Sequence, residues 1–289
     1  MKSILIPVDF SEGSFHSCRY ALELIEDQRV TLHLFHIYND QIMLPDAGMP
    51  EAMDNEMFLN TDLIMALKEQ AEQQMKELKK QVESLIKTSG KQASVRTLLQ
   101  GGDPRWEITE TCKELHPDLL VMGTRGTGKK GFLEGSMAAH IMDKAPVPVL
   151  AVPEDYVEFK LKNILYPTAF NDLDIHTLQQ IFSLLEPLRF KIHVCHFHLA
   201  KKEKKTDILM EELEKAFEKE KTERKIAFYL EEAGDKETAL KNFTQQHHID
   251  LLAFFPEKKK PFEYLFSSHH LHKKDFFKLK LPLLAVPES

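Results

Sequence analysis

An internal repeat constrains the fold of this chain more than any other feature of its sequence. Three pairs of segments recur in the same order: KSILIPVDF (2–10) with KNILYPTAF (162–170), HLFHIY (33–38) with HVCHFH (193–198), and PVPVLAVPED (146–155) with LPLLAVPES (281–289). Because the matches fall at the start, the middle and the end of each half, they indicate duplication rather than chance. We therefore expect two domains, 1–155 and 160–289, with a boundary near residues 154–160.

Each half alternates short apolar runs with longer amphipathic stretches. The apolar runs predict strands at 3–8, 30–37, 94–99, 118–122 and 147–152, and again at 163–167, 190–197, 225–231, 249–255 and 281–286. The amphipathic stretches predict helices at 14–25, 61–87, 104–115 and 136–144, and again at 172–187, 203–222, 235–246 and 267–277. Ser11 and Asp103 are the expected N-caps of two helices. Strands that are apolar on both faces and alternate with helices predict an α/β fold, with two doubly wound, parallel, five-stranded sheets in tandem.

Residues 39–60 break this alternation, because the segment contains Pro45, Gly48 and Pro50 and no regular apolar spacing. We interpret it as a long loop over one edge of the first sheet. A lid over a ligand site and a disordered insertion are both consistent with this composition.

Charge and composition exclude several classes of protein. A net charge of −7 is inconsistent with non-specific nucleic-acid binding, which needs concentrated positive charge. No apolar run reaches the roughly 20 residues that cross a bilayer, and the N-terminus does not resemble a signal peptide. Three scattered cysteines predict neither a disulfide framework nor a metal site. We therefore expect a cytoplasmic protein that binds neither nucleic acid nor membrane.

The segment LLVMGTRGTGKKGFLEGSMAAHIM (119–142) carries the strongest chemical signal. It follows a predicted strand, precedes a predicted helix and holds five of the 11 glycines of the chain: Gly123, Gly126, Gly128, Gly131 and Gly135. Glycines allow successive backbone N–H groups to converge on an anion, and the N-terminus of the following helix favours negative charge as well. The segment therefore indicates phosphate binding, although a merely flexible loop would share this composition.

Two common phosphate motifs fit this segment poorly. Gly123 to Lys129 matches the start of a P-loop, but Lys130 stands where a P-loop needs Ser or Thr for Mg²⁺. Gly126, Gly128 and Gly131 match GxGxxG, but that motif belongs after the first strand of a dinucleotide-binding fold and not after the fourth.

The segment resembles the nucleotide loop of the universal stress protein family, G-x2-G-x9-G-[ST]. Gly123 and Gly126 fit its start and Gly135-Ser136 fits its end, with eight residues instead of nine between Gly126 and Gly135. The resemblance also includes ILIPVDFS, LFHI, GGDPRWEI and PVPVLAVP, so that it covers residues 1–155 and, more weakly, 160–289. The tandem two-domain members of the family match best. The resemblance implies a Rossmann-like fold of the adenine nucleotide alpha hydrolase type.

The resemblance further implies ATP or AMP as the ligand of the first domain, with Mg²⁺ or without it. The nucleotide would lie across the carboxyl ends of the strands, where the strand order reverses. The implied binding residues are Pro7, Val8, Asp9, Ile37, Met122, Gly123, Thr124, Arg125, Gly126, Gly135, Ser136 and Met137. Asp9 is the one acidic group expected near the phosphates, where a single carboxylate could hold Mg²⁺ or activate water.

The second half lacks the counterparts of Asp9 and of the glycine loop. Ala169 matches Asp9, and the strand at 249–255 is followed by PEKKKPFEYLFSSHH, which contains no glycine. We therefore expect no ATP binding by the second domain through this loop. His196 and His198 share one face of a predicted strand, where they could contribute to a zinc site, but packed or solvated histidines explain them equally well.

No catalytic constellation stands out in the sequence, since it contains no GxSxG motif and no cysteine beside a clear base. Our first hypothesis is therefore a nucleotide-dependent regulatory module of the stress response, not an enzyme. The family's fifth strand pairs across subunits, so the two domains are expected to pair through their fifth strands, and the chain could also form a homodimer. The alternatives are a weak ATPase, a zinc-dependent hydrolase that uses the second domain, and a ligand-free scaffold.

Overall fold

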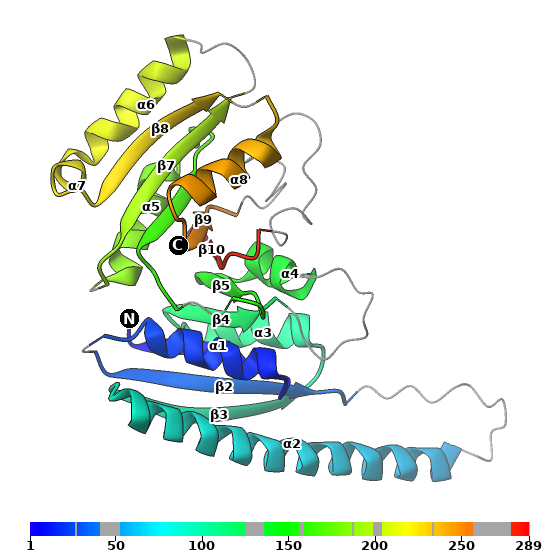
Figure 1. Ribbon diagram of the computed structural model, residues 1–289. Coiled ribbons are helices and arrows are strands. Elements are labelled where there is room, and N and C mark those ends of the chain that lie inside the picture. Colours follow the sequence, from blue (N-terminus) through cyan, green and yellow to red (C-terminus); the bar gives the residue numbers. More distant parts are fainter. Residues whose placement is uncertain are drawn as a thin grey trace.

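The computed structural model shows a long mixed sheet with helices on both faces (Figure 1). It describes residues 1–26, 28–40, 53–124, 136–156, 159–186, 188–198, 204–232, 234–256 and 279–288. Alternating strands and helices confirm the α/β class that the sequence predicts.

Both halves follow the same order of elements. The first contains β1 (Ser3–Pro7), α1 (Glu12–Glu23), β2 (Val30–Tyr38), α2 (Met53–Ser89), β3 (Ala93–Gly101), α3 (Pro104–Leu115), β4 (Leu119–Gly123), α4 (Ser136–Lys144) and β5 (Val149–Val152). The second contains β6 (Asn163–Pro167), α5 (Asp174–Leu185), β7 (Lys191–His198), α6 (Lys204–Ala216), α7 (Glu218–Thr222), β8 (Ile226–Glu232), α8 (Lys236–Gln246), β9 (Leu251–Phe254) and β10 (Leu283–Ala285).

The strands form one ten-stranded sheet in the order β3-β2-β1-β4-β5-β10-β9-β6-β7-β8. Neighbouring strands within each half are parallel. The two halves meet where β5 pairs antiparallel with β10, with Ala151 opposite Leu283 and Leu150 opposite Leu284. The two predicted five-stranded sheets are therefore halves of one continuous sheet.

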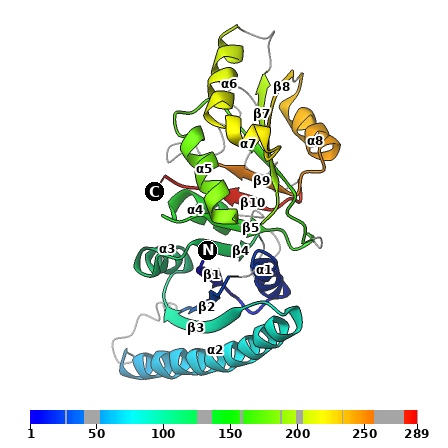
Figure 2. The ribbon, with the colours of Figure 1, turned by 90° about the vertical axis from the view of Figure 1, so that its left-hand side faces the viewer.

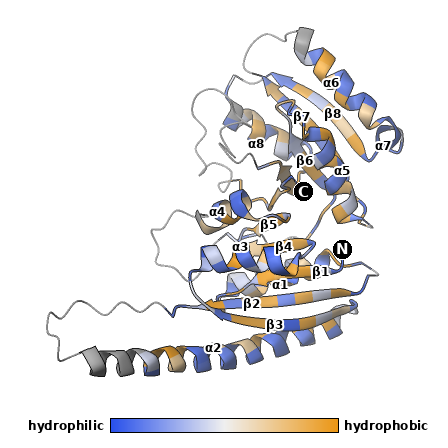
Figure 3. Cartoon of the chain, turned by 180° about the vertical axis from the view of Figure 1, so that it is seen from behind, coloured by the Kyte–Doolittle hydropathy of each residue, from blue (hydrophilic) through white to orange (hydrophobic). Residues whose placement is uncertain are grey.

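Two apolar cores cover the two faces of the sheet. One core takes residues from α1, α2, α5 and α6, and the other takes residues from α3, α4 and α8. Figure 2 shows α1 and α3 on opposite sides of β1 and β4, and Figure 3 shows the hydrophobic residues along these central strands. Strands buried on both faces explain the continuous apolar runs of the sequence. Within the described ranges, no helix has both the length and the apolar character needed to cross a membrane.

Two helix boundaries differ from the sequence prediction. The helix expected at 61–87 begins at Met53, so the predicted loop over 39–60 is wrong for 53–60, while 41–52 lies outside the described residues. The breakers Pro45, Gly48 and Pro50 all precede Met53 and do not interrupt the helix. The helix expected at 203–222 is interrupted at Phe217, which leaves helical geometry and is 2% exposed in the core. The helix predicted at 267–277 lies outside the described residues.

Local hydrogen bonds reproduce the repeat. Asp118 precedes β4 and its Oδ2 accepts from the backbone N–H groups of Lys2 and Ser3, at 2.5 and 2.9 Å. Asp250 precedes β9 and its Oδ2 accepts from Lys162 and Asn163, both at 2.9 Å. Asp118 and Asp250 are therefore equivalent positions, which aligns the later part of one half with the later part of the other.

Candidate functional site

The strand order of the first half reverses between β1 and β4. β1 pairs with β2 on one side and with β4 on the other, and the chain leaves β1 for α1 on one face of the sheet and β4 for α4 on the other face. In open α/β sheets ligands bind outside the carboxyl ends of the strands at such a reversal. Pro7 and Gly123 are the last residues of β1 and β4, so they lie at this edge.

Asp9 lies at this edge, in the turn that starts α1. Its Oδ1 accepts hydrogen bonds from the N–H of Ser11 (3.1 Å), from the hydroxyl of Ser11 (2.5 Å) and from the hydroxyl of Ser14 (2.6 Å). Ser11 is the N-cap of α1, as the sequence predicts, because its side chain accepts from the N–H of Ser14. The carboxylate is therefore held in one orientation at the N-terminus of a helix, where negative charge is stabilised.

A histidine and a phenylalanine fix the same turn. Phe10 has a φ of 60°, which non-glycine residues rarely adopt, and its ring lies 4.2 Å from that of His36. Nδ1 of His36 lies 2.7 Å from the carbonyl oxygen of Val8, so Nδ1 carries the hydrogen. Burial lowers the pKa of His36, although the Val8 carbonyl and Asp9 act in the opposite direction.

The second half repeats this support. Phe170 has the same φ of 60°, its ring lies 4.5 Å from that of His196, and Nδ1 of His196 lies 2.8 Å from the carbonyl oxygen of Thr168. Thr168, Phe170 and His196 occupy the positions of Val8, Phe10 and His36 in the repeat. Because the half without the glycine loop keeps this arrangement, we assign it to the scaffold and not to ligand binding.

The polar groups of the turn differ between the halves. Ala169 replaces Asp9, and a carboxylate appears instead at Asp174, the counterpart of Ser14. Asp174 is 4% exposed and accepts from Tyr166 Oη (2.7 Å), from the hydroxyl of Thr168 and from the N–H of Asn171. Burial raises the pKa of Asp174, while these hydrogen bonds act against the shift. The second-half carboxylate is thus buried under its own partners, whereas Asp9 is half-buried at the edge.

Three of the predicted apolar residues lie on one face of the sheet. Met122 belongs to the core under α3 and α4, and Ile37 and Met137 pack against that core. Val8 instead belongs to the core under α1 and α2. The structure therefore places apolar surface from β2, β4 and α4 on the face opposite the Asp9 turn.

The glycine loop itself lies outside the described residues. Arg125, Gly126 and Gly135 fall in the range 125–135, and of Ser136 only the backbone is described, as the first residue of α4. Thr124 is described, and its N–H donates to the carbonyl oxygen of Val152 at 3.1 Å. The assignment of phosphate contacts to this loop therefore remains the prediction made from the sequence.

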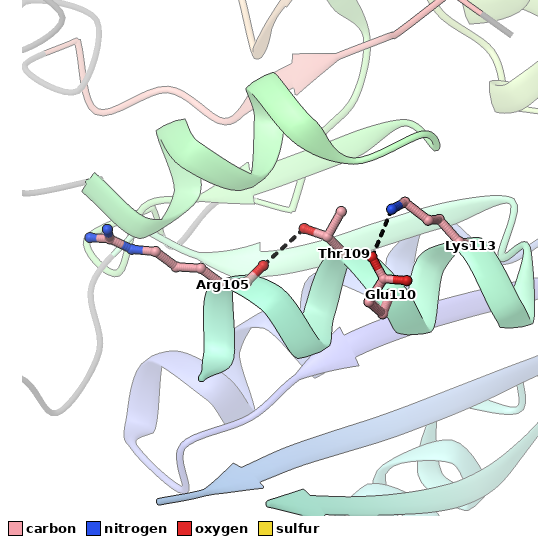
Figure 4. A network of polar contacts seen from close by, with 4 residues as sticks. All are labelled: Arg105, Thr109, Glu110 and Lys113. Atoms are coloured by element: carbon pink, nitrogen blue, oxygen red, sulfur yellow. Dashed lines mark hydrogen bonds and ion pairs between the residues drawn. The ribbon is translucent and has the colours of Figure 1, made fainter. Parts of the chain in front are cut away.

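Sequence reasoning did not single out α3 as part of this edge. Asp103 caps the helix, as predicted, by accepting from the N–H groups of Arg105 (2.9 Å) and Trp106 (3.2 Å). Figure 4 shows Arg105 in the first turn, Thr109 donating to its carbonyl oxygen at 2.9 Å, and Lys113 paired with Glu110 at 2.7 Å. Trp106, the only tryptophan of the chain, is 64% exposed beside Arg105.

The histidines of β7 are placed as the sequence suggests, side by side on one face. The rings of His196 and His198 are stacked with centroids 6.4 Å apart. Across the described ranges, however, no group of three or more His, Cys, Asp or Glu side chains is arranged to hold a metal ion. The described part of the second half thus offers these two histidines no third ligand.

These features define a class of protein: a duplicated, doubly wound α/β chain whose candidate ligand site lies at the strand reversal of its first half. The sequence profile of the Universal stress protein family matches residues 1–153, so the chain belongs to that family.

Relatives and solved structures agree with this membership. A universal stress protein of Methanocaldococcus jannaschii is 28% identical over 152 residues, which cover 52% of this chain and 81% of the relative. Universal stress protein YxiE of Bacillus subtilis is 22% identical over 150 residues, which cover 52% of this chain and 97% of the relative. The crystal structure of a universal stress protein from Archaeoglobus fulgidus covers 99% of this chain and 96% of its own, with a TM-score of 0.66 and 17% identity. That likeness shows the fold of both halves.

Proposed function

We propose that the first half binds an adenine nucleotide, ATP or AMP, at the carboxyl edge of β1, β2 and β4, and that the second half does not. One observation carries the proposal: on a scaffold repeated down to single hydrogen bonds, the first half has a half-buried carboxylate directly after its first strand and a glycine at the end of its fourth, whereas Asp174 in the equivalent turn of the second half is buried under its own partners. Counted from Asp118 and Asp250, Phe255 stands at the position of Gly123, and Ala169 stands at that of Asp9. The family resemblance supplies the nucleotide as the ligand.

The parts of the site have distinct roles in this proposal. Pro7, Val8 and Asp9 meet the adenine and ribose, and Ile37 packs on the base. The backbone N–H groups of the loop from Gly123 to Ser136 hold the phosphates. Occupancy shifts the equilibrium of the loop toward one conformation, because the nucleotide binds that conformation better. The chain then acts as a regulatory module of the stress response whose surface depends on the bound nucleotide.

Substitutions that copy second-half residues into the first half test this proposal. Gly123→Phe and Asp9→Ala introduce the residues found at Phe255 and Ala169. Thr31→Lys is the matched control. It introduces the residue found at Lys191 in the second half, and it lies near the start of β2, at the opposite end of the strands from the site. Isothermal titration with ATP and with AMP measures the affinity, and the fluorescence of Trp106 gives a second readout.

We expect both site variants to lose nucleotide binding and Thr31→Lys to keep it. Equal binding by all variants places any nucleotide elsewhere and overturns the assignment. No binding by the unaltered protein favours the ligand-free scaffold. Phosphate release from ATP that Asp9→Asn abolishes favours the weak ATPase instead, because the amide can neither hold Mg²⁺ as well nor accept a proton from water.

A further inference from the structure

One face of α1 packs against the connection between the two halves. His16, Arg19 and Tyr20 are three or four residues apart, so their side chains lie on the same face of the helix. The ring centroid of Phe159 lies 5.2 Å from that of His16 and 5.8 Å from that of Tyr20. The guanidinium carbon of Arg19 lies 5.0 Å from the same Phe159 centroid. The ring centroid of Tyr156 lies 6.1 Å from that of Tyr20. We call this contact of α1 with Tyr156 and Phe159 the clasp.

The clasp joins the helix of the candidate site to the second half. Tyr156 Oη donates to the carbonyl oxygen of Asp250 at 3.2 Å, and the carboxylate of Asp250 holds the start of β6. At its other end α1 begins after Ser11, the cap that also orients Asp9. Because β5 and β10 pair through a ladder of three residues each, contacts outside that ladder are needed to fix the halves relative to each other. The clasp is one such contact.

Two buried polar atoms of the clasp have no hydrogen-bond partner within the described ranges: Nε2 of His16 and Oη of Tyr20. Tyr20 is 2% exposed. An unpaired buried polar group loses its hydration without compensation, so the closed clasp is less favourable than its ring contacts alone suggest. Opening returns both atoms to water. This cost narrows the free-energy gap between the closed and the open clasp, so one added proton changes their ratio.

His16 is the group on which a proton acts. It donates to the backbone carbonyl of Tyr156, and because Nε2 has no partner, Nδ1 carries the hydrogen. A second proton goes to Nε2, where the described residues offer no acceptor and where Arg19 already supplies positive charge. Burial lowers the pKa of His16 and Arg19 acts in the same direction, whereas the Tyr156 carbonyl and Glu154 oppose the shift. Burial raises the pKa of Tyr20, which therefore stays neutral.

We propose that the clasp opens in acid, because protonation of Nε2 of His16 releases α1 from Tyr156 and Phe159 and loosens the first half from the second. In the open clasp His16 has its ordinary pKa of 6.5, so the closed form loses stability as the pH falls through 6.5. The counterpart of His16 in the repeat is His176, which is exposed on α5 and serves as a matched control. The device needs no bound nucleotide, so it stands apart from the proposed function.

Hydrogen exchange of the full chain at pH 7.5 and pH 5.5, followed by mass spectrometry and corrected for the intrinsic pH dependence of exchange, measures the opening. The reporters are peptides from α1 and a peptide with the amide of Tyr156, which donates to the carbonyl oxygen of Pro153. In the unaltered protein we expect the opening constant to rise several-fold on acidification. The ceiling is about tenfold, the change that a free imidazole of pKa 6.5 produces over this range.

Three variants separate the causes. His16→Gln keeps a donor for the Tyr156 carbonyl but cannot titrate, so its opening constant should not respond to pH. Tyr20→Phe removes the unpaired hydroxyl and keeps the ring, so exchange of the reporters should slow at both pH values. His176→Gln should match the unaltered protein.

An equal pH response of His16→Gln and the unaltered protein overturns the proposal. Exchange in Tyr20→Phe that is as fast as in the unaltered protein, or faster, overturns it as well, because the hydroxyl then has a partner in the closed clasp. Peptides from β2 report on the rest of the first half. If they accelerate together with α1 in acid, the whole half unfolds and the clasp is not the unit that opens.

Discussion

The buried histidine of β7 makes a sharp prediction about stability against pH. His193 is 5% exposed, and its Nδ1 lies 3.1 Å from Tyr229 Oη while its Nε2 lies 3.2 Å from Asn163 Oδ1. The amide nitrogen of Asn163 donates to the carbonyl oxygen of His248 at 3.2 Å, which fixes Oδ1 as the acceptor. In the neutral form of His193 the hydrogen is therefore on Nε2, and Tyr229 donates to Nδ1.

Burial lowers the pKa of His193 from 6.5 to about 4, and the nearby Lys191 and His247 add to the shift. Between about pH 6.5 and pH 4, His193 therefore binds a proton in the unfolded chain but not in the folded chain. The resulting stability is fully present well above pH 6.5, declines as the pH falls through 6.5, and is gone below about pH 4. Between pH 7.5 and pH 5.0 this single group removes about 2 kcal/mol from the free energy of unfolding.

Urea denaturation at pH 7.5 and at pH 5.0 measures this contribution. His193→Gln cannot titrate, so its free energy of unfolding should fall by about 2 kcal/mol less than that of the unaltered protein between these two pH values. His176→Gln, on the exposed side of α5, controls for the removal of a histidine from the surface. The comparison uses differences between two pH values, so the cost of the substitution itself cancels. If His193→Gln and the unaltered protein lose the same stability on acidification, the assignment of a neutral His193 with a lowered pKa is refuted.

Three further predictions concern the scaffold. Asp174→Ala leaves the hydroxyls of Tyr166 and Thr168 without their acceptor. Urea denaturation should therefore show a free energy of unfolding lower by about 3 kcal/mol. The control variant Asp172→Ala, at an exposed neighbouring position, should change it little. Asp103→Ala removes the cap of α3 and should cost about 1 kcal/mol in thermal unfolding followed by circular dichroism; no loss would show that water replaces the cap. The fragment 1–155 leaves the edge of β5 unpaired, so light scattering should find it self-associated; a monomeric fragment would contradict the importance of that edge.

Much of the fold follows from local rules that act on neighbouring residues. The strands and most helices lie within a few residues of their predicted bounds, because buried parallel strands need unbroken apolar runs. Ser11 and Asp103 are caps because a short polar side chain just before a helix satisfies its free N–H groups. The expected pairing of the fifth strands came from the resemblance to the family, and the structure has β5 next to β10.

The remaining features depend on contacts between distant residues. At the interruption, the ring of Phe217 packs against that of Phe182, with 6.3 Å between centroids, and helical periodicity cannot reveal this contact. A comparison of Asp9 with Ala169 alone indicates simple loss of a carboxylate, because Asp174 stands in the helix and not at the end of the strand.

Joining both copies in one chain through adjacent strands has an evolutionary consequence. In a symmetric dimer every substitution appears twice, so neither subunit can change alone. Covalent linkage also replaces a bimolecular encounter with an effective concentration in the millimolar range, so the strands β5 and β10 stay together even in dilute solution. The ligand site of the second copy is therefore free to diverge, while the shared edge and the repeated scaffold contacts of Asp250 and His196 are retained.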